Sequence, residues 1–154
     1  MYVFDTTPLS SLFRNYFRSA FPTLWRRLDQ LIADGSLTST REVRRELDQY
    51  ARADSEWLTK HAGIFTTPTA SEAAIVREIY RVRHFHQNIE QKKIQNGGLV
   101  ADAFVVAKAA DIDGIVVTLE TAMPNAAKIP NMCEHLEVPC INLEQFMSNE
   151  GWTF

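Results

Sequence analysis

The sequence predicts one α/β domain, a three-layer α/β/α sandwich in which helices cover both faces of a mainly parallel sheet of about five strands. Its 154 residues are the length of one ordinary domain, so we assign residues 1–154 to a single domain. Hydrophobic residues make up 45% of the chain and charged residues 23%, which is the balance of a globular protein. Short apolar segments alternate with amphipathic helical segments along the whole chain.

The predicted strands are short and rich in apolar or β-branched residues. We place them at 1–5, 36–39, 64–67, 115–118 and 139–142. We expect helices over 9–16, 22–33, 39–53, 71–85 and 100–110, and from about 143 onwards. Ser39 and Glu42 have the S-x-x-E spacing of a capping box at the start of the third helix.

Several features exclude other classes of protein. No stretch of 18 or more apolar residues occurs, so we expect no membrane-spanning helix. The first residues contain no basic leader and no small-residue cleavage site, which predicts a protein that is not exported. Cys133 and Cys140 are too few for a disulfide framework and are typical of reduced, buried thiols. We therefore expect a cytoplasmic location.

Two carboxylates follow apolar strands directly. Asp5 ends the segment Tyr2 to Phe4, and Glu120 follows the β-branched strand that ends at Thr118. Because the carboxyl ends of parallel strands meet at one edge of a sheet, both acids are predicted at the edge where α/β proteins bind ligands. For Asp5 an alternative stays open, since a strand-end aspartate can simply cap the following helix.

Two further acids lie on helical segments. Glu46 falls within the apolar arc that Val43 and Tyr50 define, which turns it towards the protein interior. Its alternative role is an ion pair with Arg41 or Arg45.

Asp102 opens a helix, A-D-A-F-V-V-A-K-A-A, that is apolar on nearly every side and is therefore expected to be buried. Its alternative role is a favourable interaction with the helix dipole. Four converging acids would repel one another unless a divalent cation neutralised them, and oxygen ligands favour Mg²⁺ or Mn²⁺.

The net charge of −3 is unevenly distributed. Residues 1–93 contain 14 Lys and Arg against 11 Asp and Glu, whereas residues 94–154 contain 2 against 8. The basic clusters of the first two thirds are suited to binding phosphates, although solvated helix faces carry the same pattern. Aromatic residues between Phe13 and Trp25 are compatible with a partner groove, but at helical spacing we favour a core role.

These residues carry a resemblance to a known family. The motifs are V-F-D-T-T with Asp5, V-R-R-E-L with Glu46, D-A-F-V-V-A with Asp102 and T-L-E with Glu120, in that order. Together they resemble the PIN domain, a ribonuclease fold found in many bacterial toxins of toxin–antitoxin pairs. The segments F-P-T-L-W at 21–25, K-I-P at 128–130 and G-W at 151–152 further resemble a bacterial subgroup of that clan, catalogued as a domain of unknown function.

The resemblance implies a metal-dependent endoribonuclease, a toxin that hydrolyses RNA phosphodiesters with water activated by Mg²⁺ or Mn²⁺. In this reading Asp5, Glu46, Asp102 and Glu120 are the catalytic and metal-binding residues. Thr6 and Thr118 support the carboxylates or the phosphate by hydrogen bonds. The residues implied to bind the RNA backbone are Arg14, Arg41, Arg45, Lys92 and Lys93.

The partners that the resemblance implies are RNA, a small antitoxin protein that inserts into the acidic pocket, and a second copy of the chain in a homodimer. The alternative function is a non-catalytic PIN-like scaffold that binds RNA or a protein. Clustered acids favour the enzyme, because a pure binder gains nothing from negative charge beside a phosphate.

Overall fold

The sheet of this protein is entirely parallel, as predicted. The computed structural model describes the backbone of residues 1–95 and 100–154 and the side chains of residues 1–91 and 100–154. Within these residues five strands pair in the order β3-β2-β1-β4-β5. They are β1 (Tyr2–Phe4), β2 (Leu37–Thr40), β3 (Phe65–Thr66), β4 (Ile115–Val117) and β5 (Cys140–Ile141). β2 has the predicted length and is shifted by one residue, the other four are shorter than predicted, and all lie where the sequence placed them.

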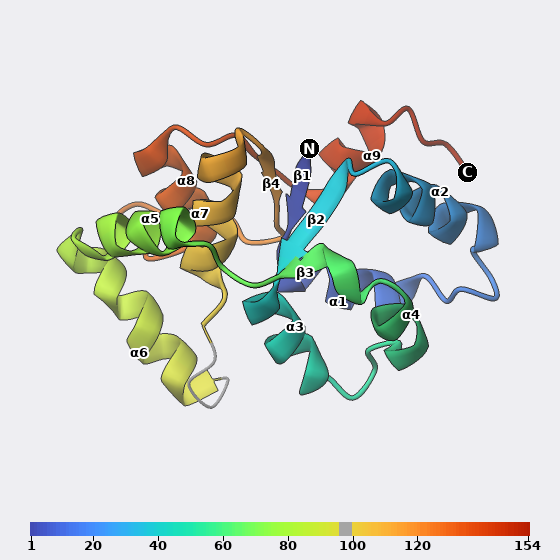
Figure 1. Cartoon of the computed structure of the whole chain (residues 1–154), viewed down its shortest axis with the longest axis horizontal. Helices are drawn as coiled ribbons and strands as arrows, with labels where there is room; N and C mark the ends of the chain where they lie inside the picture. The colour runs from blue at the N-terminus through green and yellow to red at the C-terminus, as the bar shows by residue number, and fades with distance from the viewer. Residues whose placement is uncertain (96–99) are drawn as a thin grey trace.

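Helices cover both faces of the sheet, so the predicted three-layer sandwich is confirmed. Figure 1 shows α5, α7 and α8 on one side of the strands and α2 and α9 on the other. None of the helices in the described residues is long and apolar enough to cross a membrane. The bounds are α1 (Thr6–Asn15), α2 (Pro22–Ala33), α3 (Arg41–Asp48), α4 (Ser55–Lys60), α5 (Ala70–Tyr80), α6 (His86–Gln95), α7 (Asp102–Ile112), α8 (Ile129–Leu136) and α9 (Leu143–Asn149).

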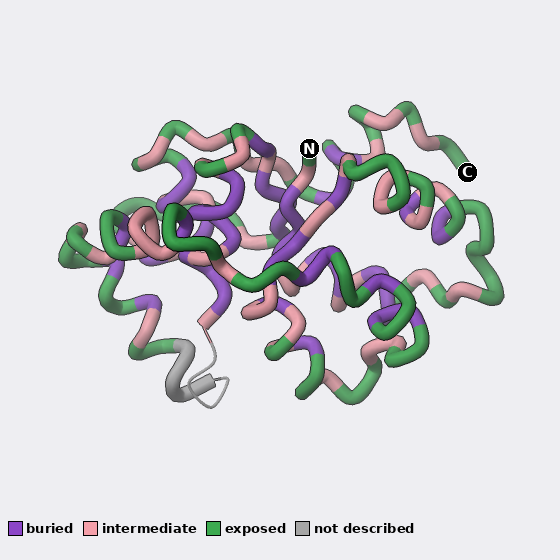
Figure 2. Tube along the Cα trace, in the orientation of Figure 1, coloured by how far each residue is buried: buried purple, intermediate pink, exposed green. Residues whose placement is uncertain are grey.

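The core is centred on β1, β4 and α7. Val3, Phe4 and Val117 are completely buried, and α7 packs against β1, β2 and β4. Figure 2 shows the central strands and most of α7 as buried. The prediction of a helix buried on nearly all sides is confirmed even for Lys108, whose Nζ donates to the Ser39 carbonyl (2.7 Å) and to the Thr66 hydroxyl. Burial lowers the pKa of Lys108.

The start and end of α3 differ from the prediction. The helix begins at Arg41 and ends at Asp48, not near residue 53, and no side chain caps its first turn. Ser39 remains in β2, where its hydroxyl donates to the Phe4 carbonyl of β1 at 2.7 Å. The predicted capping box of Ser39 and Glu42 is therefore wrong, because Ser39 belongs to β2 and its hydroxyl is bonded to β1 instead of to the first turn of α3.

The helix predicted over 71–85 ends earlier than predicted, and a further helix follows it. α5 ends at Tyr80, the extended backbone of Val82 (ψ 112°) interrupts the helical path, and a 3₁₀ turn at Arg83–Phe85 leads into α6. Thr69 and Glu72 form the capping box that starts α5. Sequence periodicity missed the break because Phe85, which is buried, keeps the apolar spacing across it. The sequence analysis also did not predict the helices α4, α6 and α8.

The aromatic residues between α1 and α2 are divided between core and surface. Phe13 and Trp25 stack at 5.7 Å between ring centroids and are buried, as the core reading predicted. Phe17 and Phe21 remain exposed. The Trp25 indole donates to the Tyr16 carbonyl at 2.6 Å, which holds α2 against the end of α1.

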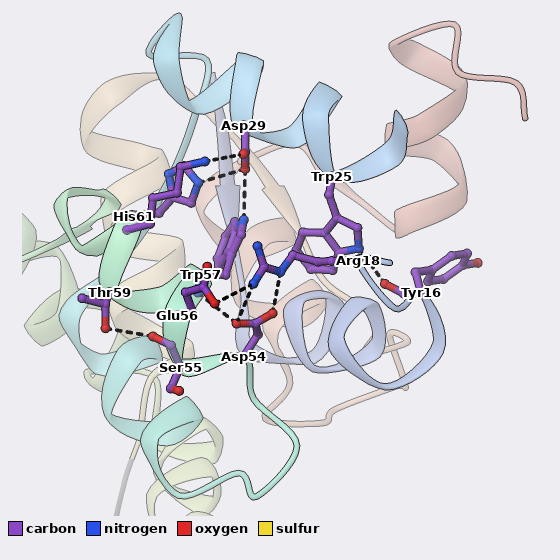
Figure 3. A network of polar contacts seen from close by, with 11 residues as sticks. Tyr16, Arg18, Trp25, Asp29, Asp54, Ser55, Glu56, Trp57, Thr59 and His61 are labelled. Atoms are coloured by element: carbon purple, nitrogen blue, oxygen red, sulfur yellow. Dashed lines mark hydrogen bonds and ion pairs between the residues drawn. The ribbon is translucent and has the colours of Figure 1, made fainter. Parts of the chain in front are cut away.

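A polar network fastens this aromatic region to α4 (Figure 3). Asp29 of α2 accepts hydrogen bonds from the Trp57 indole (3.1 Å) and from His61 (2.9 Å), and pairs with Lys60 at 2.9 Å. Arg18 pairs with Asp54, which itself caps α4 by accepting from the Trp57 amide. Burial raises the pKa of Asp29, but the bonds from Lys60 and Trp57 and the charges of His61 and Lys60 hold it below its ordinary value of 3.8.

Replacing Asp29 is predicted to destabilise the fold in a pH-dependent way. Asp29→Ala leaves the Trp57 indole and His61 without their acceptor, which costs about 1–3 kcal/mol of unfolding free energy. Because the folded pKa of Asp29 is depressed, its contribution is present above about pH 4 and lost as the pH falls through the folded pKa. Urea titrations of both proteins at several pH values should show their difference shrinking below about pH 4.

The matched control is Asp34→Ala, which removes an acid just after the same helix whose carboxylate, among the described residues, accepts from the exposed Gln30 alone. Its unfolding free energy should stay within about 0.5 kcal/mol of the parent protein. An Asp29→Ala protein as stable as this control would show that the network contributes nothing.

Candidate functional site

The strand order reverses between β1 and β4, and the predicted acids lie beside this point. From β1 the chain first adds β2 and β3 towards one edge strand of the sheet. It then crosses over β1 and adds β4 and β5 towards the other edge strand. Phe4 pairs in register with Val117, and the Asp5 amide donates to the Val117 carbonyl at 3.0 Å. Asp5 and Thr118 are therefore neighbours at the carboxyl ends of β1 and β4, the position at which parallel α/β sheets bind ligands.

Two hydroxyl groups hold the carboxylate of Asp5. The Thr118 hydroxyl donates to Asp5 Oδ2 at 2.9 Å, and the Thr7 hydroxyl donates to the same oxygen at 3.0 Å. Although Asp5 is the residue before α1, its side chain makes no capping hydrogen bond. The capping role that the sequence left open is therefore not the one that Asp5 performs.

The charge of Asp5 is buried and surrounded by neutral donors. Only 2% of the residue is exposed, and no lysine, arginine or histidine of residues 1–91 and 100–154 forms an ion pair with it. Burying an ionised carboxylate costs several kcal/mol unless a cation compensates it. This arrangement suits a carboxylate that receives a cation from solution.

Glu120 lies next to Asp5 at the same edge. Its amide donates to the Thr118 hydroxyl at 3.1 Å, and its Oε2 accepts from the Ile129 amide at the start of α8 (2.8 Å). An open depression of about 460 Å³ is lined by Thr118 and Glu120 together with residues at the start of α9. The edge that holds Glu120 is therefore accessible from solution.

The charges of Asp5 and Glu120 both act on the pKa of two neighbouring cysteines. Cys133 and Cys140 are free cysteines, and a hydrogen bond with Cys140 and burial raise the pKa of Cys133. The negative charges of Asp5 and Glu120 raise it further. Since one thiol is reached by both charges, the two carboxylates share one local environment.

Asp102 is the most deeply buried of the four predicted acids. It is the first residue of α7 and is 1% exposed. A helix that precedes a parallel strand runs in the opposite direction, so the first turn of α7 lies at the same carboxyl edge as Asp5. Its Oδ2 accepts a hydrogen bond of 2.6 Å from the Asn88 amide of α6.

Glu46 reaches the edge from α3, which follows β2 directly. Its Oε1 accepts from the Thr6 hydroxyl at 2.5 Å, so Thr6 supports a carboxylate as predicted, with Glu46 as its partner. Arg41 and Arg45, the ion-pair partners considered for Glu46, instead bind Glu42 at 2.9 and 3.1 Å. Glu42 thus receives the two arginines on the flank of the helix.

The four acids share one edge of the sheet, but their described side chains do not form a metal-binding group. Among the described side chains, no three His, Cys, Asp or Glu residues form a group that could hold a metal ion. Each carboxylate is turned onto a donor of the protein: two threonines for Asp5, the Asn88 amide for Asp102, the Ile129 amide for Glu120 and Thr6 for Glu46. The donor set is still all oxygen, which fits Mg²⁺ or Mn²⁺ in its chemistry.

Comparison with known families adds one finding. A family model described as a domain of unknown function, DUF4411, matches residues 2–154, nearly the whole chain. The protein belongs to the DUF4411 family. Searches of curated proteins and of solved structures gave no match.

The basic residues predicted to bind RNA lie on three helices of the DUF4411 domain. Arg14 is exposed near the end of α1, and Arg41 and Arg45 are half exposed on α3. Lys92 and Lys93 belong to α6, but their side chains lie outside the described residues.

The sequence did not single out two residues that the structure places in the site. Thr7 received no role in the sequence analysis, yet its hydroxyl donates to Asp5 and accepts from the Leu119 amide at 3.0 Å. Asn88 lies between the predicted helices over 71–85 and 100–110, in a segment for which the sequence predicted no element, and no motif includes it. The one available signal was the pair of hydroxyls that follows Asp5, of which Thr6 was chosen.

Removing the hydroxyls that hold Asp5 is predicted to impair any cation binding at this edge. Thr118→Val keeps the shape of the side chain but deletes a donor to Asp5, and should weaken Mn²⁺ binding about 10–100-fold in a calorimetric titration. Thr118→Ser restores the donor and should recover most of that loss. Thr23→Val, at an exposed threonine of α2, is the matched control and should bind Mn²⁺ as the parent protein does. Equal affinities for Thr118→Val and the parent would contradict the role given to Thr118.

Proposed function

We propose that this protein is a metal-dependent endoribonuclease that hydrolyses RNA phosphodiesters at the carboxyl edge of its sheet, with Mg²⁺ or Mn²⁺ bound first by Asp5. The observation that carries the proposal is the environment of Asp5. Its buried negative charge is held by two neutral hydroxyls, beside Glu120 and at the point where the strand order reverses. A fold gains little by burying such a charge unless a cation binds there.

Each acid has a definable part in this mechanism. Asp5 is the central ligand, because Thr7 and Thr118 fix one of its oxygens and so restrict the rotation of the carboxylate. Asp102 and Glu120 complete the site directly or through water, and Glu46 with Thr6 orients the attacking water from the side of α3. When bound, the metal ion lowers the pKa of the attacking water and stabilises the charge on the leaving 3′ oxygen.

The proposed substrate follows from charge and from the resemblance to PIN domains. Arg41 is the first residue of α3, which begins at the same edge as the acids, and Arg45 and Arg14 lie further along α3 and α1; in this proposal they bind the phosphates of the RNA backbone. RNA binding requires Arg41 and Arg45 to share or leave Glu42, their present partner. We further propose that the protein is the toxin of a toxin–antitoxin pair, blocked by a small protein that covers the acidic edge, and that it forms a homodimer.

Asp5→Asn is predicted to abolish cleavage. The substitution keeps an oxygen that can accept from both Thr7 and Thr118 but removes the charge that the metal requires, so Mn²⁺-dependent cleavage of a labelled single-stranded RNA should fall by more than about 100-fold. Circular dichroism should show an unchanged fold.

The matched control is Asp113→Asn. Asp113 adopts a left-handed conformation (φ 55°) just before β4, at the opposite edge of the sheet, and asparagine tolerates that conformation well. This variant should cleave at the parent rate. Undiminished cleavage by Asp5→Asn would refute the proposed function.

The alternative is a PIN-like scaffold that binds RNA or a protein without cutting it. The observation that favours it is that the described acids are turned onto protein donors and form no group of three ligands. Differential scanning fluorimetry with Mn²⁺ separates the two functions. The nuclease predicts a rise in melting temperature that grows with Mn²⁺ concentration and is lost in Asp5→Asn, whereas the scaffold predicts no rise in either protein.

A further inference from the structure

Asn88 is a buried amide that connects three separate elements of the fold. It lies on α6, is 2% exposed, and is in hydrogen-bond contact with Asp102 of α7, Ala127 in the segment before α8, and Tyr80 of α5. Fully buried asparagines are uncommon because each polar atom must find a partner away from water. Asn88 meets that requirement, because both ends of its amide have hydrogen-bond partners.

The three hydrogen bonds fix the orientation of the amide. Nδ2 donates to Asp102 Oδ2 at 2.6 Å and to the Ala127 carbonyl at 3.2 Å, which uses both of its protons. Oδ1 accepts from the Tyr80 hydroxyl at 3.0 Å. A rotation of the amide by 180° would point Oδ1 at two acceptors, so the network allows one orientation only.

The donor that Asn88 offers to Asp102 is neutral. An amide directs one oxygen of the carboxylate without adding a positive charge, whereas a lysine or arginine at the position of Asn88 would add one. Burial, together with the negative charge of Asp102, raises the pKa of Tyr80. The Tyr80 hydroxyl therefore remains protonated and continues to donate to Asn88.

The hydrogen bond from Asn88 to Ala127 also affects the backbone that holds Glu120. Residues 121–128 connect Glu120 to α8, and the Glu120 carboxylate accepts from the Ile129 amide just beyond that segment. Asn88 holds the segment at Ala127, two residues earlier. One side chain therefore fixes both the direction of Asp102 and the backbone that anchors Glu120.

We propose that Asn88 is a positioning residue of the metal site, which sets the direction of Asp102 and the backbone that holds Glu120, and so determines how tightly the edge binds its divalent cation. The inference rests on the proposed function, since it assigns Asn88 a part in that same site. Carboxylate ligands are commonly held by such neighbours, whose loss costs about 10–100-fold in metal affinity. A residue that served packing alone would affect stability and leave the metal requirement unchanged.

The test compares three variants by the Mn²⁺ concentration that gives half-maximal RNA cleavage. Asn88→Ala should raise that concentration about 10–100-fold, with the rate at saturating Mn²⁺ much less affected, because the ion itself then orders the carboxylates. Tyr80→Phe keeps the apolar ring and both Asn88 donors but removes the bond that orients the amide, and should raise it less than about 10-fold. This second variant keeps the test decisive if Asn88→Ala does not fold.

The matched control is Asn131→Ala. Asn131 also holds the 121–128 segment, through a 2.7 Å bond from Nδ2 to the Met123 carbonyl, but it is on α8 and does not contact Asp102 through any hydrogen bond of the described residues. It should lose stability without a change in the Mn²⁺ requirement. Melting temperatures measured without metal record the stability loss of every variant separately.

The outcomes distinguish the two proposals. A parent protein that responds to Mn²⁺, with an unchanged requirement in Asn88→Ala, or in Tyr80→Phe where Asn88→Ala does not fold, overturns the role of Asn88 and leaves the proposed function standing. A parent protein with neither cleavage nor a Mn²⁺-dependent melting shift overturns both. A raised requirement in Asn131→Ala equal to that in Asn88→Ala also overturns the inference, since it would assign the effect to the segment as a whole.

Discussion

The buried negative charge of Asp5 is the constraint on which this account depends. The charge lies at the end of the central strand, between β2 and β4, where solvent cannot stabilise it. The parallel pairing of β1 with β4 fixes the position of this charge, because the two strands end at the same level and Thr118 therefore contacts Asp5. Two threonines lower the cost of the charge without neutralising it, and a divalent cation would remove most of the remainder.

The same topology explains how acids far apart in sequence reach one edge. A helix that follows a strand begins at the carboxyl edge, which places Glu46 there through α3. A helix that precedes a strand also begins there, which places Asp102 through α7. Helix α6 supplies Asn88, which reaches Asp102 through a hydrogen bond.

The sequence predicted the parts of this arrangement that depend on local pattern. Apolar runs that end in Asp5 and Thr118 identified the two central strands, and the apolar surface of the α7 segment predicted that Asp102 is buried. The parts that depend on tertiary contacts were not predictable. Ser39 pairs with β1 instead of capping α3, Thr7 and not Thr6 contacts Asp5, and Asn88 is identified only once α5, α6 and α7 are packed together. Local periodicity carries no information about such partners.

The most direct test of a cation site at Asp5 is diffraction from crystals soaked in Mn²⁺, with anomalous data collected at the manganese absorption edge. The account predicts an anomalous peak within ligand distance of Asp5, on the side facing Glu120 and Asp102, which is lost in crystals of Asp5→Asn. The absence of a peak at Asp5 at saturating Mn²⁺, or a peak that persists in Asp5→Asn, would contradict it.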